Sequence, residues 1–475
     1  MVCLTATAAP RVAQDICKAF DIDEAGLFRT STYRPNLHLL AESGKTKAEL
    51  NPRLCKFLKE NPGPSIVYVT LQKQTEELAL MLTRNGFKAK SFHAGMDAPS
   101  KARIQEDFMR RNDLIIVATI AFGMGIDKTN IRNVVHYNIP SSLESYSQEI
   151  GRAGRDGAIS KCMFYVCGED LHLREMFARG DLPSKESVRG VIGDIFDRTT
   201  RGLPIGGEIK RSLITQGKDF DIRATTLANI YAQLELTHDL IRATTPMYTK
   251  YTFKGSGEYS KRINSDKSPE AHAIRQNATK ASTLFHIDID AAANQFKVPR
   301  TDLIRKLNDL NETGVLELKP SGVLNVYKVT NTPPKTPGEI ENLTKSIYDV
   351  MAKREKEALL RTEQMLALIT GKACFTKALA EHFGDSLPDD KKECGHCTWC
   401  MTHVAVVQQI PDPVPFNDGR FKAILNSIPA RDDARLLARI GFGITSPRST
   451  AMKLGRDPIF GSMDDHNFEV HPVCR

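Results

Sequence analysis

The stretch SIVYVTLQKQTEELALMLTRN, residues Ser65–Asn85, joins a short apolar run to a segment with helical spacing. Its first residues have the β-branched content of a buried strand, and Leu78 and Leu82 then recur on one helical face. The same alternation continues, with strands predicted at Leu114–Thr119, Asn133–Tyr137 and Cys162–Cys167 and a helix at Ser100–Arg110. It predicts a parallel sheet covered by helices on both faces, with ligands bound at the carboxyl ends of the strands.

Composition bounds the class of protein. At 475 residues the chain is long enough for three or four domains, and its 41% hydrophobic residues suffice to build their cores. The formal net charge of +8 suits a nucleic-acid partner, but many other proteins reach that value. No stretch reaches the roughly 18 consecutive apolar residues of a membrane helix, so we expect no membrane association.

The segment Ser145–Gly157, SYSQEIGRAGRDG, carries the strongest chemical signal. We predict a helix that presents Gln148, Arg152 and Arg155 within about one helical turn. Two guanidiniums at this spacing suit a triphosphate whose charge must be neutralised during transfer, which is the role of an arginine finger. The alternative is that both arginines are ordinary surface charges.

The segment Ala118–Asp127, ATIAFGMGID, is predicted to be a loop that follows a buried strand. Gly123 and Gly125 would let backbone amides approach a phosphate or sugar, and Asp127 is placed to accept from a ribose hydroxyl. Such a glycine pattern is weak evidence alone. It becomes strong in register with the arginine segment that follows about 25 residues later.

Four of the ten cysteines fall close together near the C-terminal end of the sequence. They are Cys374, Cys394, Cys397 and Cys400, in the spacing C-x19-C-x2-C-x2-C. The chain is too long and too poor in cysteine for a disulfide scaffold, so the cluster indicates metal in a reducing compartment. We predict a structural Zn²⁺ site. Two alternatives stay open: cysteines without metal, and a histidine replacing one ligand, from His382, His396 or His403.

Two segments of similar build lie between the sheet and the cysteines. Residues 207–256 predict two helices and then the alternating run Met247–Phe253, and residues 280–330 predict two helices and a hairpin around Lys319–Gly322. Helix–helix–hairpin units in tandem are typical of winged helices, and generic α+β structure is the alternative. The polar stretch Gly255–Ala278 between them is expected to be mobile.

Taken in order, the motifs resemble the RecQ branch of superfamily-two helicases. The resemblance covers roughly residues 1–185 and rests on Met1–Ala8 (MVCLTATA), Arg34–Leu37 (RPNL), Ser65–Thr70 (SIVYVT), Phe92–Gly95 (FHAG), Ala121–Asp127 (AFGMGID) and Gln148–Gly157 (QEIGRAGRDG). DEAD-box RNA helicases share the arginine segment, but theirs usually begins with His where this one has Gln148. RecQ helicases also carry a zinc module of very similar cysteine spacing, which supports the Zn²⁺ prediction.

The resemblance implies roles for residues of a RecA-like motor lobe. Arg155 would be the principal arginine finger and Arg152 its phosphate-contacting neighbour, while Gln148 and Asp127 would couple nucleotide to DNA. Thr119 and His93 would lie along the DNA track, although a structural role for His93 is equally open.

A complete enzyme of this kind needs a phosphate loop and an Asp-Glu box to hold ATP and Mg²⁺. Gly44-Lys45-Thr46 and Asp23-Glu24-Ala25-Gly26 imitate these motifs, but the sequence predicts no buried apolar strand directly before either of them. We therefore expect an N-terminally truncated chain that lacks the first RecA-like lobe, uses ATP and Mg²⁺ only with that lobe, and does not hydrolyse ATP alone.

DNA is the expected partner, single-stranded and forked or duplex. Candidate phosphate contacts are Lys250 in the first winged-helix-like unit and Arg300, Arg305 and Lys306 in the second. Ordinary solvated charges are the alternative for each of them. Other DNA repair or replication proteins are further candidate partners, and the substrate implies the nucleus.

The expected fold is α/β, with a RecA-like parallel-sheet lobe, winged-helix-like α+β units, a helical zinc-binding module and a small helical C-terminal region. The corresponding residues are 1–50 (remnant of a first lobe and inter-lobe segment), 51–200 (second RecA-like lobe), 207–256 and 280–330 (winged-helix-like units), 339–405 (zinc module) and 415–475 (C-terminal region). The C-terminal region is similar to the end of the Rothmund–Thomson-type RecQ branch. The predicted function is 3′-to-5′ DNA unwinding in repair, recombination or replication; a non-catalytic DNA-binding protein is the alternative.

Overall fold

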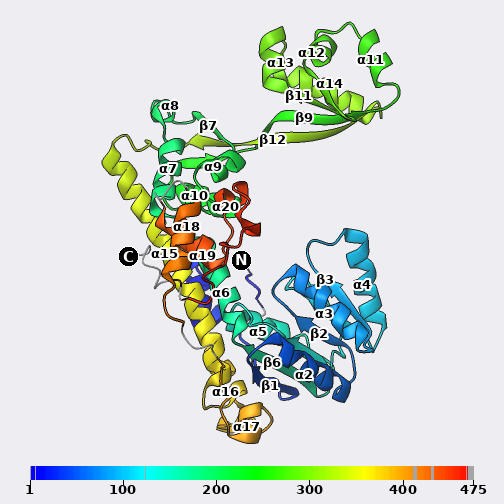
Figure 1. The fold of residues 1–475 in the computed structure, drawn as a ribbon, viewed down its shortest axis with the longest axis vertical. Helices are drawn as coiled ribbons and strands as arrows, with labels where there is room; N and C mark the ends of the chain where they lie inside the picture. Colours follow the sequence, from blue (N-terminus) through cyan, green and yellow to red (C-terminus); the bar gives the residue numbers. More distant parts are fainter. Residues whose placement is uncertain are drawn as a thin grey trace. The chain divides into compact units, whose positions relative to one another are not determined.

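The computed structural model describes residues 2–5, 7–123, 125–409, 414–428, 433–466 and 468. It divides into two compact units, and each consists of segments that are distant in sequence (Figure 1). Unit 1 contains residues 1–179 and 353–416 with 464–466, and unit 2 contains residues 180–352 and 417–463. The part of the expected C-terminal region at 429–432, 467 and 469–475 lies outside the described residues.

Unit 1 is built on a six-stranded sheet in the order β1-β6-β5-β2-β4-β3, in which every pair is parallel. Its strands are β1 (Leu37–Gly44), β2 (Ser65–Tyr68), β3 (Ala89–Phe92), β4 (Ile115–Ala118), β5 (Asn133–His136) and β6 (Ser160–Cys167). Its helices within residues 1–179 are α1 (Pro10–Phe20), α2 (Lys47–Glu60), α3 (Gln72–Arg84), α4 (Ala98–Arg110), α5 (Leu143–Ile150) and α6 (Glu169–Arg179). The predicted parallel α/β lobe is confirmed.

Helices cover both faces of this sheet, as buried parallel strands require. On one face, α2 and α3 bury Leu54 and Leu82 against the strands. On the other, α4 and α5 bury Phe108 and Tyr146. Several of these helices have an N-cap residue whose side chain accepts a hydrogen bond from the first turn. In α4, for example, Asp97 accepts from the backbone N–H of Ser100.

The sheet begins earlier than the expected boundary at residue 51. Strand β1 pairs with β6 from Leu37↔Ser160 to Gly44↔Cys167, and residue 51 falls inside α2. The expected inter-lobe segment therefore supplies an edge strand of this lobe. Because its apolar residues alternate with His38 and Glu42, β1 lacks the continuous apolar run by which the central strands were found.

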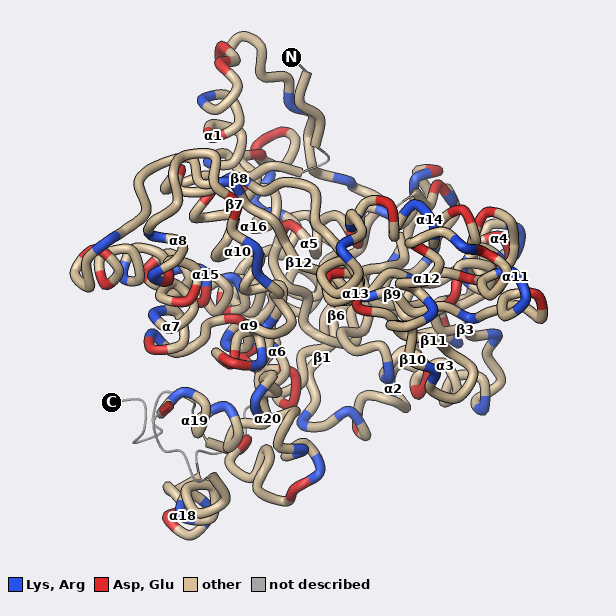
Figure 2. The backbone as a smooth tube through the Cα atoms, turned by 90° about the horizontal axis from the view of Figure 1, so that it is seen from above, with Lys and Arg blue, Asp and Glu red and all other residues tan. Residues whose placement is uncertain are grey.

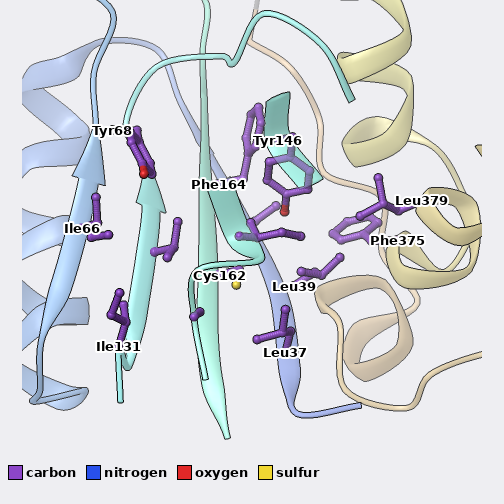
Figure 3. Close-up of a cluster of buried hydrophobic side chains, with 14 of the residues drawn as sticks. Leu37, Leu39, Ile66, Tyr68, Ile131, Tyr146, Cys162, Phe164, Phe375 and Leu379 are labelled. Carbon is purple, nitrogen blue, oxygen red and sulfur yellow. The ribbon is translucent and has the colours of Figure 1, made fainter. Parts of the chain in front are cut away.

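The cysteine-bearing segment belongs to the same unit as the sheet. It contains α16 (Phe375–His382), a short 3₁₀ turn (Pro388–Asp390) and α17 (Thr398–Thr402). Phe375 and Leu379 pack on Leu37 and Leu39 of β1 in one continuous core (Figure 3). The parallel sheet and the cysteine module are thus one folded body, although some 190 residues separate them in sequence.

Helix α15 (Pro337–Thr370) leads into this module as one long helix of 34 residues. Its early residues Leu343 and Ile347 belong to the core of unit 2, and its late residues Met365 and Ile369 to the core of unit 1. No described helix is long and apolar enough to span a membrane.

Unit 2 has a proximal body with its own core. Its elements are α7 (Lys185–Ile195), α8 (Arg198–Arg201), β7 (Glu208–Arg211), α9 (Leu213–Asp219), α10 (Ala224–Leu236) and β8 (Ile241–Ala243), closed by the end of β12 (Leu316–Val329). The helices α18 (Asp418–Ser427), α19 (Ala434–Phe442) and α20 (Pro447–Ala451), with a 3₁₀ turn (Leu454–Arg456), form a further cluster in this unit. Arg439 on α19 donates to the carbonyls of Gly180 and Leu182.

The second α+β unit is inserted into the first; the expected tandem arrangement is wrong. Strand β9 (Met247–Gly255) pairs along its length with the first part of β12, from Leu316↔Gly255 to Leu324↔Met247. At the far end of these two strands lies a distal body (Figure 1). It comprises α11 (Tyr259–Ser265), α12 (Pro269–Asn277), β10 (Thr279–Ala281), β11 (Leu284–Asp288), α13 (Ile289–Phe296) and α14 (Arg300–Glu312).

Two local expectations fail in the distal body. Lys319–Gly322 is no hairpin turn, because Lys319 pairs with Thr252 and Ser321 pairs with Lys250 within one strand. Pro320 is tolerated there because this part of β12 is the edge of its sheet. The stretch Gly255–Ala278, expected to be mobile, instead contains α11 and α12, which bury small and apolar residues in the distal core.

Candidate functional site

The arginine segment begins as a helix and ends as a tight turn. Helix α5 ends at Ile150, so Gln148 lies on the helix whereas Arg152 and Arg155 lie beyond it, in turns over residues 151–157. The expectation of one helix that carries all three residues is therefore wrong. For Arg155 the physical reason is the preceding Gly154, whose φ of +54° is a left-handed conformation that continues no right-handed helix.

The turn brings both guanidiniums onto the glycine loop that follows β4. Arg155 donates from Nη1 to Asp127 Oδ1 at 2.6 Å and to the carbonyl of Ile126 at 3.3 Å. Arg152 donates to the carbonyl of Gly123. A Cβ on Gly123 would stand 2.4 Å from the Arg152 Cζ atom, so only glycine leaves room for this guanidinium. Two of the predicted motifs thus meet at the carboxyl end of the sheet.

A cavity of about 430 Å³ opens beside this turn. One wall of the cavity is polar and consists of Gln148, Arg152 and Arg155. Another wall is formed by Thr376 and Leu379 of α16. Gln148 Nε2 donates to Thr7 Oγ1 at 3.0 Å, which connects the arginine segment to the TATA motif near the start of the chain. The cavity therefore combines basic, amide and hydroxyl groups that are suited to an anionic ligand. Gly125 lies in the same loop, exposed and with φ +77°.

Thr119 and His93 follow β4 and β3 at the same end of the sheet. Both are buried, with 9% and 8% of their surface exposed. His93 Nε2 lies 3.2 Å from Glu76 Oε1, which gives the ring a structural contact. Their expected place along a DNA track stays a prediction.

The predicted DNA contacts in unit 2 differ in their availability. Lys250 is exposed on β9. Arg300 is half-buried and donates to Asp290 at 3.0 Å and to the carbonyl of Tyr248 at 2.5 Å. Arg305 pairs with Asp302 at 3.2 Å on its own helix, and Lys306 pairs with Asp266.

Acidic residues interleave with basic ones over the helices of the distal body (Figure 2). Arg300 and Lys306 form ion pairs within the distal body. DNA contact by Lys250, Arg300, Arg305 and Lys306 stays a prediction.

The four cysteine thiols converge on one point. All four sulfurs lie within 4.8 Å of one another, and individual separations are 3.4 Å for Cys397–Cys400, 3.9 Å for Cys394–Cys400 and 4.0 Å for Cys374–Cys397. Tetrahedral zinc with Zn–S bonds of about 2.3 Å places its sulfurs about 3.8 Å apart. The thiols therefore fit Zn²⁺. When bound, the ion crosslinks the start of α16, through Cys374, to the start of α17, through Cys397.

None of the three nearby histidines joins this cluster. His382 Nε2 lies 2.7 Å from Glu144 Oε1 on α5, and His403 Nδ1 lies 3.8 Å from Glu393. His396 stacks on His38 of β1, with ring centroids 4.4 Å apart. The ligand set is therefore the four cysteines, and the histidines attach the module to the lobe or lie on its surface.

Sequence reasoning missed two largely buried polar pairs in this lobe. His136 on β5 and Glu149 on α5 form a pair at 2.6 Å with 1% and 8% of their side chains exposed. Asp170, also buried, binds Lys47 Nζ at 2.6 Å, and burial raises the pKa of its carboxyl. No spacing in the sequence could have paired these residues, because the two members of each pair come from separate elements. Glu149 lies directly after Gln148 in the arginine segment, but its side chain is buried.

Two known protein families match separate segments of this chain. Residues 49–157 match the family described as Helicase conserved C-terminal domain, and residues 337–401 match the family described as RecQ zinc-binding. ATP-dependent helicase wrn-1 of Caenorhabditis elegans is 37% identical over 198 residues, which are 40% of this chain and 18% of that protein. ATP-dependent DNA helicase Q-like 5 of Arabidopsis thaliana is 28% identical over 383 residues, 78% of this chain and 41% of that protein.

A bacterial protein shows the same likeness. The probable ATP-dependent DNA helicase RecS of Bacillus subtilis is 33% identical over 193 residues, which are 40% of this chain and 39% of that protein. The chain spans less than half the length of each of these relatives. Among solved structures, the E. coli DEAD-box protein SrmB is 24% identical over 28% of this chain and 79% of that chain, with a TM-score of 0.27.

Proposed function

Because this chain belongs to the RecQ family of helicases, we propose that it works as the carboxyl-terminal part of an ATP-dependent DNA helicase. In the working enzyme, ATP would be the substrate held between this lobe and a first RecA-like lobe. The chain would move 3′ to 5′ and unwind duplex or forked DNA in repair, recombination or replication. Nuclear location and membership of the Rothmund–Thomson-type branch are parts of the same proposal.

One observation carries this proposal: Arg152 and Arg155 meet the Gly123–Asp127 loop at the carboxyl end of the parallel sheet. This is the edge at which such sheets bind ligands. Arg155 is held by a pair in which its own side chain is 37% exposed and that of Asp127 is 84% exposed. An exposed pair contributes roughly 0–1 kcal/mol, so little opposes its exchange for a phosphate oxygen. An arginine finger then contributes about 10³–10⁵ in kcat.

The remaining residues have supporting roles in this proposal. Gln148, through its hydrogen bond to Thr7, would couple the arginine turn to the inter-lobe segment. Zn²⁺ on the cysteine cluster would keep α16 against the lobe. Thr119 and His93 would lie along the DNA track, and Lys250 would contact DNA phosphates and give salt-dependent affinity. Mg²⁺ would accompany ATP on the first lobe, since the residues that hold it are not among those of this site.

The test compares the 475-residue chain alone with the chain joined to a first RecA-like lobe from a RecQ relative. We expect DNA-stimulated ATP hydrolysis only in the joined protein, and a fall in kcat of about a thousandfold or more for Arg155→Ala. Arg111→Ala, an exposed arginine paired to Asp113 away from the turn, serves as the matched control. Equal turnover by Arg155→Ala and the parent would contradict the arginine-finger role.

A non-catalytic DNA-binding protein is the second candidate. It would use the zinc module and the α+β bodies without ATP, and the exposed Lys250 is the observation in its favour. A joined protein without DNA-stimulated ATPase, but with forked-DNA affinity that falls steeply with salt, would select this candidate.

A further inference from the structure

Residues 151–157, the arginine turn, are fixed from the side of the inter-lobe segment by one guanidinium. Arg34 Nη1 donates to the carbonyl of Gly151 at 3.2 Å, and Arg34 Nη2 donates to those of Ala153 and Gly154 at 3.0 and 2.5 Å. A planar guanidinium can serve several carbonyls at once, which an ammonium cannot do with the same geometry. Arg34 therefore bonds to the backbone on both sides of Arg152.

Asn36 completes this contact two residues later in the RPNL motif. Its Nδ2 donates to the carbonyls of Gly154 and Ala158 at 2.8 and 3.0 Å. A Cβ on Gly154 would stand 2.5 Å from that Nδ2 atom, so the close approach needs glycine. Both side chains thus donate directly to backbone carbonyls of the turn, which lies beyond the end of α5.

The far side of the turn is held by the lobe itself. The N–H of Gly154 donates to the carbonyl of Ile131 at 2.9 Å, and Asp156 pairs with Arg132 at 2.6 Å. The turn therefore lies between a fixed anchor on the sheet and the Arg34–Asn36 pair.

The segment that carries Arg34 is itself attached to the zinc module. The backbone N–H of Thr32 and the hydroxyl of Ser31 each donate to Asp385 Oδ2 at 2.7 Å. Asp385 follows α16, whose first turn begins at the zinc ligand Cys374. Displacement of the inter-lobe segment would thus pull on the carbonyls that orient Arg152 and Arg155.

We propose that Arg34, assisted by Asn36, is the positioning residue that sets Arg152 and Arg155 for phosphoryl transfer and couples them to the inter-lobe segment. The functional half of this statement rests on the proposed ATPase. In this role Arg34 acts through the backbone carbonyls of the turn.

The first experiment uses the 475-residue chain and measures hydrogen exchange of the amides of residues 151–157. Arg34→Ala should speed their exchange by about tenfold to a hundredfold, Arg34→Lys by less, and the amides of β2 and β5 should be unchanged. Arg29→Ala is the matched control, because that guanidinium lies in the same segment but donates to the carbonyls of Ala8 and Phe383. Unchanged exchange of the turn in Arg34→Ala would overturn the proposal.

The second experiment uses the chain joined to a first lobe. Arg34→Ala should lower kcat about tenfold or more with KM for ATP nearly unchanged, and Arg34→Lys should restore part of it. A variant with altered turn exchange but parental kcat would overturn the positioning role. If the joined parent shows no ATPase while the exchange result holds, the proposed function fails and the structural role of Arg34 survives.

Discussion

The zinc module lies some 190 residues beyond the sheet on which it packs, whereas the distal body closely follows β8 of its own unit, yet it is the distal body that has the more separate structure. The module shares a single hydrophobic core with the motor sheet, since Phe375 and Leu379 pack with Leu37 and Leu39 (Figure 3). The distal body has a separate core and is joined to the rest of unit 2 by two paired strands. Sequence distance therefore does not indicate whether two parts of the chain fold independently. Whether they share a hydrophobic core does indicate it.

The largest expected effect is that of removing zinc. A structural zinc site contributes about 10–16 kcal/mol of apparent binding free energy. Chelation, or Cys397→Ser at a fully buried ligand, should therefore destabilise the whole motor lobe, because its core is shared with the module. The distal body should keep its hydrogen-exchange protection. Cys3→Ser, an exposed thiol outside the cluster, is the control. Loss of hydrogen-exchange protection in residues 374–400 alone would contradict the shared core of the module and the lobe.

The next effect comes from the shared core itself. Phe375→Ala removes a ring that is 1% exposed, and such a change costs about 3–5 kcal/mol in a core that cannot collapse around the cavity. Chemical denaturation should show this loss in the transition of the motor lobe. A midpoint equal to that of the parent would mean that the module packs on the lobe without stabilising it.

A matched change in the distal body should stay local. Leu303 on α14 is fully buried in the distal core, and Leu303→Ala should cost about 2–5 kcal/mol there. Hydrogen exchange should rise in α11–α14 and leave the parallel sheet of unit 1 unchanged. Spread of the effect into the sheet would show that the two bodies are one cooperative unit after all.

The smallest effect tests the polar contact between the zinc module and the lobe. A hydrogen bond from His382 lowers the pKa of the Glu144 carboxyl to about 2. A depressed carboxyl pKa stabilises the fold above the unfolded value near 4.5, and that contribution is lost as pH falls toward 2. The pair is partly exposed, so it contributes under about 1 kcal/mol. The stability gap between the parent and Glu144→Gln should therefore close between those two pH values; a constant gap would contradict it.

Much of the lobe could be predicted from its central strands and helices. Buried parallel strands are continuously apolar, as Ile66 to Val69 are, and helical spacing placed α3 and α4 to within a few residues. Edge strand β1 was missed because half of its residues face outward. The RPNL motif was noticed, but the carbonyls that Arg34 binds could not be named before the turn was known.

The sequence alone determined the parallel sheet, the cysteine cluster and the motifs at the strand ends, because each depends on residue types at short spacing. Only the tertiary structure decided that the arginines leave the helix, that β9 pairs with β12 around an inserted body, and that the zinc module completes the core of the lobe. These depend on which distant surfaces meet, and any apolar face can be buried by any other of matching shape. Local periodicity specifies the face but not its partner.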